Sequence, residues 1–132
     1  TQASSQDCSI HLHPESERFI LITDSTVLSR VVGNMIKNAL EACVTGDMVT
    51  VGCHLEQGEA RFWVHNPTYM PLSVQRQVFK RSFSTKGAKR GVGTYSMRLL
   101  SERYLGGTVE FMSQKAEGTT FTARYKHTSI TS

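Results

Sequence analysis

Residues 28–42, LSRVVGNMIKNALEA, carry the clearest structural signal in the chain. Apolar side chains recur at intervals of three and four residues, and they are Leu28, Val31, Val32, Met35, Ala39 and, just beyond, Cys43. That spacing is typical of an amphipathic helix with one buried face. Asp24 and Ser25 can cap its start, and Gly46 is a stop signal after its end. We therefore expect one long helix that packs on a core through this apolar stripe.

The same segment carries polar residues in a pattern that allows ligand binding. Asn34 and Asn38 are four residues apart, so both amides lie on one helix face. Lys37 and Glu41 flank them. Such amides can bind a metal ion or a phosphate oxygen, although spacing alone favours an ordinary solvated face. Gly33 costs about 1 kcal/mol relative to alanine inside a helix, which favours the close approach of another group.

The rest of the chain predicts pairs of strands separated by helices. A short apolar run at 18–23 (RFILIT) is predicted to form a strand before the long helix. One hairpin is predicted to pair 48–55 with 59–66, and a second to pair 108–113 with 119–126. Between the hairpins the predicted elements are a short helix at 72–79, a loop at 82–93 and a helix at 94–104. This order predicts an α+β fold, a two-layer α/β sandwich in which a mixed sheet carries its helices on one face.

Length and composition are those of one globular domain. The chain has 132 residues, of which 39% are hydrophobic and 20% charged. No apolar run approaches the ~20 residues that a membrane span needs. We expect one folded domain at 17–128, preceded by a linker or an added segment at 1–16 and followed by a tail at 129–132. Because the chain opens without methionine, we expect it to be part of a longer protein.

The cysteines predict neither a disulfide framework nor a zinc site. Cys8, Cys43 and Cys53 are odd in number and show no Cys-x-x-Cys spacing. We interpret them as core thiols of a protein in a reducing compartment.

A second candidate ligand site is the basic, glycine-rich segment 79–96 (FKRSFSTKGAKRGVGTYS). Five of the fifteen lysines and arginines lie in it. Gly91 and Gly93 allow a close backbone approach, and they lead into a predicted helix whose first N–H groups favour an anion. The segment is neither a Walker loop nor a dinucleotide fingerprint, and a flexible surface loop explains it equally well.

Taken together, these elements resemble the ATP-binding domain of the sensor histidine kinases, members of the Bergerat-fold family that also includes gyrase. The resemblance covers roughly residues 17–127. Residues 28–42 resemble the N box of the family, 78–86 (VFKRSFSTK) the F box, 91–94 (GVGT) the G2 box and 118–121 (GTTF) the terminal Gly-Thr-x-Phe strand. Any one box is weak evidence, whereas four in the family's order are a specific match.

The resemblance implies a site for ATP and Mg²⁺. It implies Asn38 as the Mg²⁺ ligand, with Asn34 and Lys37 as catalytic residues beside the phosphates; an amide oxygen suits this hard ion. The residues implied to bind the nucleotide are Asn34, Asn38, Asn66, Lys86, Arg90, Gly91, Gly93 and Thr94. Lys86 and Arg90 would belong to a mobile lid.

Two departures from the family pattern bear on specificity and reaction type. Asn66 takes the position of the G1-box aspartate that accepts a hydrogen bond from the adenine amino group. An amide can accept there too, but a free amide can turn over and pair with guanine unless a neighbour such as the Thr68 hydroxyl fixes it. A turn-forming Asn-Pro without a ligand is the alternative. Asn34 takes the position where the family's hydrolases place a glutamate base. Because an amide cannot take a proton at neutral pH, direct phosphoryl transfer is favoured over hydrolysis.

The first hypothesis is therefore the catalytic ATP-binding domain of a bacterial two-component sensor histidine kinase. It would bind Mg-ATP and donate the γ-phosphate to a histidine in an upstream dimerisation domain outside this chain, with a response regulator as an indirect partner. The alternative is a degenerate module of the same fold that binds nucleotide weakly or not at all and acts in docking or regulation.

Further expectations concern partners and location. Nucleic-acid binding is not expected, because the aromatic residues form no exposed stacking series. We expect the isolated domain to be monomeric and cytoplasmic, where a longer protein could still be tethered to the inner membrane.

Overall fold

The computed structural model describes residues 8–79 and 88–127, with side chains described outside 88–94. The strands are β1 (Ser9–Leu12), β2 (Met48–Glu56), β3 (Glu59–Asn66), β4 (Thr108–Gln114) and β5 (Gly118–Lys126). The helices are α2 (Ser25–Ala42), α3 (Leu72–Gln75) and α4 (Ala88–Arg103).

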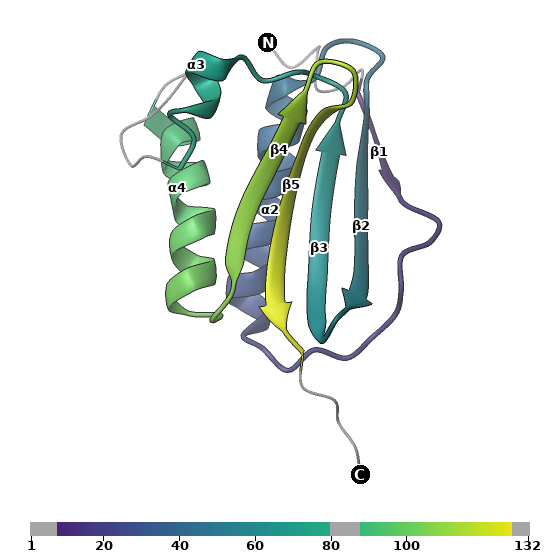
Figure 1. Ribbon diagram of the computed structural model, residues 1–132, viewed down its shortest axis with the longest axis vertical. Helices are drawn as coiled ribbons and strands as arrows, with labels where there is room; N and C mark the ends of the chain where they lie inside the picture. The colour runs from purple at the N-terminus through teal and green to yellow at the C-terminus, as the bar shows by residue number, and fades with distance from the viewer. Residues whose placement is uncertain (1–7, 80–87, 128–132) are drawn as a thin grey trace.

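The fold has two layers, a sheet and the helices on one of its faces. The sheet is five-stranded with the order β1-β2-β3-β5-β4. β1 runs parallel to β2, whereas all other neighbours are antiparallel, so the sheet is mixed. In Figure 1 helix α2 lies behind the sheet, and α4 lies to the left of β4, where it packs against α2 and β4. The predicted α+β sandwich is therefore confirmed.

Helix α2 forms as its sequence pattern predicts. The Asp24 carboxylate caps the helix by accepting a hydrogen bond from the Val27 N–H at 3.0 Å. Val31 and Met35 of the apolar stripe are fully buried and pack with Val64 of β3 in the core. The same stripe thus sets the rotation of the helix and carries the neighbouring Asn38 toward the end of β3.

The two hairpins are confirmed, and their register determines where the strand ends meet. In the first turn Gln57 and Gly58 both have positive φ, 53° and 78°, as a two-residue hairpin turn requires. β3 also pairs with β5, which places Asn66 directly opposite Thr119. One end of the central strands therefore brings these two polar residues together above the C-terminal half of α2.

The strand predicted at 18–23 is wrong. The position beside β2 is occupied by β1, which lies inside the residues predicted to be a linker, so the later segment has no strand to pair with. Ile20 and Ile22 are 71% and 77% exposed as the chain crosses toward α2. An apolar run of strand length does not form a strand unless it pairs with a neighbouring strand. The domain boundary at residue 17 stays a prediction.

The loop predicted at 82–93 is also wrong in part, because α4 already begins at Ala88. Residues 80–87 lie outside the described residues. Each helical glycine costs about 1 kcal/mol, an amount that the packing of α4 against α2 and β4 can offset. Among the helices that the structure describes, none combines the length and apolar character needed to span a membrane.

Candidate functional site

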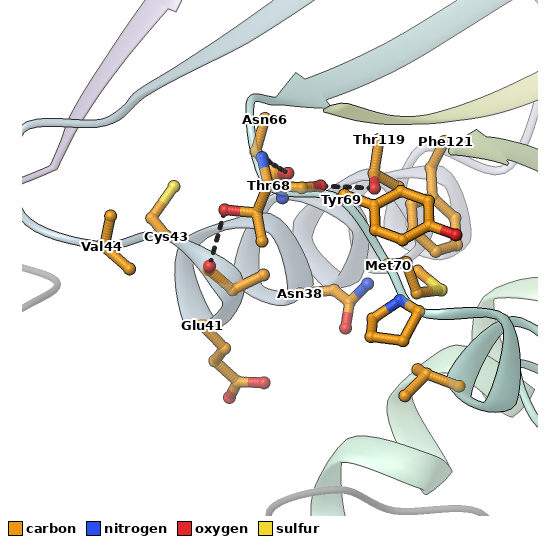
Figure 2. A pocket seen from close by; sticks show the side chains of 13 residues that line it. Asn38, Glu41, Cys43, Val44, Asn66, Thr68, Tyr69, Met70, Thr119 and Phe121 are labelled. Atoms are coloured by element: carbon orange, nitrogen blue, oxygen red, sulfur yellow. Dashed lines mark hydrogen bonds between the residues drawn. The ribbon is translucent and has the colours of Figure 1, made fainter. Parts of the chain in front are cut away.

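A cavity of about 340 Å³ opens between the C-terminal half of α2 and the segment that follows β3 (Figure 2). Its polar lining includes Asn38 from α2, Asn66 and Thr68 from the segment after β3, and Thr119 from β5. Apolar side chains, Met70 and Phe121 among them, complete the wall. The size and the mostly apolar lining with a few convergent polar groups are typical of a small-molecule site.

The amide of Asn66 is held in one orientation. Its Oδ1 accepts a hydrogen bond from the Thr68 N–H at 3.0 Å, and its Nδ2 donates to the Ala39 carbonyl at 3.3 Å. Turning the amide over would place Nδ2 against the Thr68 N–H, two donors, and Oδ1 against the Ala39 carbonyl, two acceptors. The free amide that the sequence allowed is therefore not what the structure contains.

The end of α2 explains why these partners are available. The Cys43 N–H donates to Leu40 O at 3.2 Å, so the helix does not close with a regular bond to Ala39. The last carbonyls of a helix need partners from elsewhere. Asn66 supplies one at Ala39 O, and the Thr68 hydroxyl supplies another at Ala42 O, 3.0 Å away. The segment after β3 thus caps α2 while it forms the cavity wall.

Further hydrogen bonds fix that segment to the sheet. The Thr119 hydroxyl donates to Thr68 O at 2.7 Å, and the Met70 N–H donates to Ser113 Oγ at 2.8 Å. The sequence offered the Thr68 hydroxyl as the group that fixes Asn66, whereas in the structure the Thr68 N–H does so and the hydroxyl donates to Ala42 O. Thr119 was not among the residues predicted from the sequence. For Thr119, the Gly-Thr-x-Phe motif was the signal that could have identified it.

Gly118 allows the close approach on which the site depends. Its φ is +85°, and a Cβ at this position would lie 2.2 Å from Asn66 O and 2.7 Å from the Pro67 Cα. No side chain fits there without moving the backbone. The glycine of the Gly-Thr-x-Phe motif therefore brings β5 against the residues that line the cavity.

Asn38 is the predicted Mg²⁺ ligand. It is only 7% exposed and lines the cavity, and Figure 2 shows its side chain pointing from α2 toward the segment that carries Met70. Asn34 lies one turn earlier and is half-buried, whereas Lys37 is exposed. Neither lines this cavity. Of the three α2 residues proposed from sequence, the structure brings Asn38 together with Asn66.

The remaining predicted site residues lie at the start of α4 or before it. Arg90, Gly91, Gly93 and Thr94 are in the first turns of α4, which packs against α2. Lys86 lies outside the described residues. In the described part of the chain, no group of three or more His, Cys, Asp or Glu side chains is placed to hold a metal ion. The phosphate-binding role of these residues stays a prediction.

Cys43 forms part of the cavity wall at the C-cap of α2. Burial, followed by a hydrogen bond and charge repulsion from the Cys8 thiol, raises the pKa of Cys43 to about 12. The thiol is therefore neutral at physiological pH and adds no charge to the cavity.

Comparison with known proteins agrees with this geometry. The profile of the family described as "Histidine kinase-, DNA gyrase B-, and HSP90-like ATPase" matches residues 23–129. Sensor protein CitS of Bacillus subtilis (strain 168) is 31% identical over 99 residues, covering 72% of this chain and 18% of CitS. Sensor histidine kinase DcuS of Escherichia coli (strain K12) is 32% identical over 102 residues, covering 71% of this chain and 18% of DcuS. The chain thus spans under a fifth of the length of these relatives.

Solved structures share the fold. The mycobacterial sensor histidine kinase MprB has a TM-score of 0.77 at 20% identity, covering 96% of this chain and 88% of that one. Full-length ShkA in complex with AMPPNP has a TM-score of 0.79 at 20% identity, covering 95% of this chain and 27% of that one. The family resemblance seen in the sequence is confirmed. The chain belongs to the histidine kinase-, DNA gyrase B- and HSP90-like ATPase family, and its fold is that of sensor histidine kinase catalytic domains.

Proposed function

We propose that this chain binds Mg-ATP in the cavity between α2 and β3 and donates the γ-phosphate to a histidine of an upstream dimerisation domain. The observation that carries the proposal is the convergence of Asn38 and Asn66 on one cavity. The first belongs to the N-box helix and the second stands at the family's base-reading position. A cavity lined by both Asn38 and Asn66 fits a nucleotide that lies across α2.

The fixed amide of Asn66 suits adenine. Each of its polar atoms makes one hydrogen bond within the protein and retains the capacity for another. Oδ1 can accept from the adenine amino group, and Nδ2 can donate to the neighbouring ring nitrogen. Guanine presents the reverse order of acceptor and donor. Met70 and Phe121 offer apolar walls for the ring.

Asn38 fits a role as a Mg²⁺ ligand. Mg²⁺ prefers oxygen ligands, keeps several waters and is commonly held by one or two protein oxygens together with phosphates. The Asn38 amide oxygen would be the protein ligand, and the bound ion would offset the negative charge of the phosphates. α2 holds this side chain nearly buried at the wall of the cavity, where its amide oxygen would meet the ion.

The side chains around the phosphates favour transfer over hydrolysis. Asn34 stands one turn before Asn38 and cannot act as a general base toward water. Exposed Lys37 would lie beside the phosphates, and Lys86 and Arg90 would close over them, as the family resemblance implies. The family resemblance also implies Gly91, Gly93 and Thr94 near these phosphates. Because α4 begins at Ala88, the N–H groups of its first turn, up to Gly91, are the ones that would favour the anionic phosphates.

The partner domains would lie outside this chain. CitS and DcuS are named as sensors, and the chain matches 18% of each. We infer that it forms the corresponding part of a longer kinase, which supplies the dimerisation domain with its phosphoacceptor histidine and acts on a response regulator. The chain itself would be monomeric and would lie on the cytoplasmic side. The neighbour ShkA is described in complex with AMPPNP, an ATP analogue, which supports a nucleotide in this fold.

Titration calorimetry with Mg-ATP tests the proposal. Asn38→Ala should weaken binding at least about tenfold, which corresponds to ~1.4 kcal/mol, and should remove its dependence on Mg²⁺. Ser29→Ala, on an exposed part of the same helix, is the matched control and should bind like the unmodified chain. Unchanged affinity of Asn38→Ala would remove Asn38 from the site. A folded chain that binds no Mg-ATP would instead support the degenerate module.

A further inference from the structure

Two of the three cysteines lie side by side although they are far apart in the sequence. Cys8 immediately precedes β1, and Cys43 caps the C-terminus of α2. The Cys8 thiol donates to Val44 O at 3.4 Å, and it is also hydrogen-bonded to the Cys43 thiol. The Ser9 N–H donates to Asp47 O at 3.1 Å, which holds the start of β1 against the residues after α2. Both sulfur atoms therefore lie where the start of β1 contacts the end of α2, at the wall of the cavity.

We propose that Cys8 and Cys43 are an oxidation site, at which a peroxide joins them in a disulfide that ties the start of β1 to the end of α2. A disulfide places its sulfurs about 2.05 Å apart, closer than a hydrogen-bonded pair of thiols. Cys8 precedes the β1 ladder and is not part of it, so no ladder hydrogen bond of its own opposes its movement toward Cys43.

The chemistry balances with one hydroperoxide per disulfide. The Cys8 thiolate attacks one peroxide oxygen, so that an S–O bond forms, the O–O bond breaks and the departing hydroxide takes up a proton as water. The Cys43 sulfur then attacks the Cys8 sulfenic acid, the S–S bond forms, and the leaving hydroxide takes the Cys43 proton as a second water. Two thiols lose two electrons and hydrogen peroxide is reduced to two molecules of water.

The accessibility of the two thiols sets their order of reaction. Cys8 is half-buried, whereas Cys43 is only 6% exposed. The more accessible Cys8 meets the oxidant first, and the Cys43 thiol is already in contact to resolve the sulfenic acid. Burial, the Cys8 thiol and the Asp47 carboxylate raise the pKa of Cys43, and conversion of Cys8 to a neutral sulfenic acid removes the charge repulsion that comes from Cys8.

Cys53 offers a control within the same chain. Its thiol donates to Glu17 O at 3.4 Å from the middle of β2. Ser9 is in register with Met48, so Cys53 lies about 16 Å further along β2 from that point. In the folded protein Cys53 cannot reach Cys8.

Non-reducing peptide mapping of the reduced chain after treatment with hydrogen peroxide tests the proposal. We expect a Cys8–Cys43 cross-linked peptide, an intact mass lower by the two lost hydrogen atoms and a melting temperature higher by about 5 to 10 °C, because the bridge closes a loop that contains all of α2. Dithiothreitol should reverse all three changes.

Three variants make the result decisive. Cys53→Ser should form the bridge like the unmodified chain, whereas Cys8→Ser and Cys43→Ser should form none. Cys8→Ser changes a half-buried residue outside the secondary structure, so it keeps the test valid if Cys43→Ser folds poorly. Cross-links that involve Cys53, or free alkylation of Cys8 and Cys43 after peroxide treatment, would overturn the proposal. None of these measurements requires nucleotide binding.

Discussion

Replacing Asn66 by aspartate tests the hydrogen bonds on which base recognition is proposed to depend. From the sequence alone, a free amide would give weak discrimination between ATP and GTP, and Asn66→Asp would strengthen it. The structure does not meet the condition of that expectation, because Thr68 N–H and Ala39 O already fix the amide. The unmodified chain should therefore discriminate between the two nucleotides, and the variant should lose stability.

The magnitudes follow from the two bonds. Pairing with guanine requires the amide to turn over, which loses both bonds at about 1 kcal/mol each and corresponds to a preference for ATP of roughly 30-fold or more. Asn66→Asp retains an acceptor for Thr68 N–H but sets a carboxylate oxygen against the Ala39 carbonyl at a position that is only 5% exposed. We expect a loss of ~1 to 3 kcal/mol in the free energy of unfolding. The loss should shrink in acid, because a protonated carboxyl can again donate to Ala39.

Competition binding of ATP and GTP and urea unfolding measure the two effects. Asn34→Asp makes the same chemical change on α2 outside the cavity, at a position proposed to lie beside the phosphates that ATP and GTP share, so it should change both affinities alike and leave their ratio unchanged. ATP and GTP affinities within about threefold of each other in the unmodified chain would refute the fixed amide as the base-reading group. An Asn66→Asp variant as stable as the unmodified chain would refute the contact with Ala39.

Two further predictions concern stability. Gly33 is exposed, and no described atom lies within 4 Å of the position that a Cβ would take, so Gly33→Ala should raise the free energy of unfolding by ~0.5 to 1 kcal/mol in urea titrations; a loss would reveal a group that needs the glycine. Burial raises the pKa of Tyr125 above 10.0, and its hydroxyl is hydrogen-bonded to Ser101 at 2.7 Å. Since the folded state favours the neutral phenol, the contribution of Tyr125 to the free energy of unfolding is present below pH 10 and is lost as the pH rises through its raised pKa. Tyr125→Phe loses the hydrogen bond to Ser101, so its free energy of unfolding near pH 7 should fall by about 1 kcal/mol. Because phenylalanine does not titrate, the stability of the variant should also decline less steeply above pH 10, as measured by unfolding between pH 7 and 11.

Elements whose signal is local could be predicted from the sequence. α2 and both hairpins follow from apolar periodicity and turn residues, which act within a few positions. β1 was not predicted in this way, because its polar and apolar residues alternate over only four positions and all four of its side chains are exposed. Its place is determined by pairing with β2 across the sheet, and the apolar run at 18–23 had a stronger local pattern with no partner.

In the candidate site, too, some features have a local sequence signal and others depend on tertiary contacts. Asn38 and Asn66 could be identified because their side chains belong to recognisable patterns. The orientation of Asn66 depends on a backbone carbonyl at Ala39 and a backbone N–H at Thr68, groups that almost any residue at these positions would supply. An aspartate could not donate to Ala39 O, whereas asparagine both caps that carbonyl and keeps an acceptor for the base. The departure from the family's aspartate therefore exchanges one set of hydrogen bonds for another that would serve the proposed role in base recognition, which argues against reading it as a mark of degeneration.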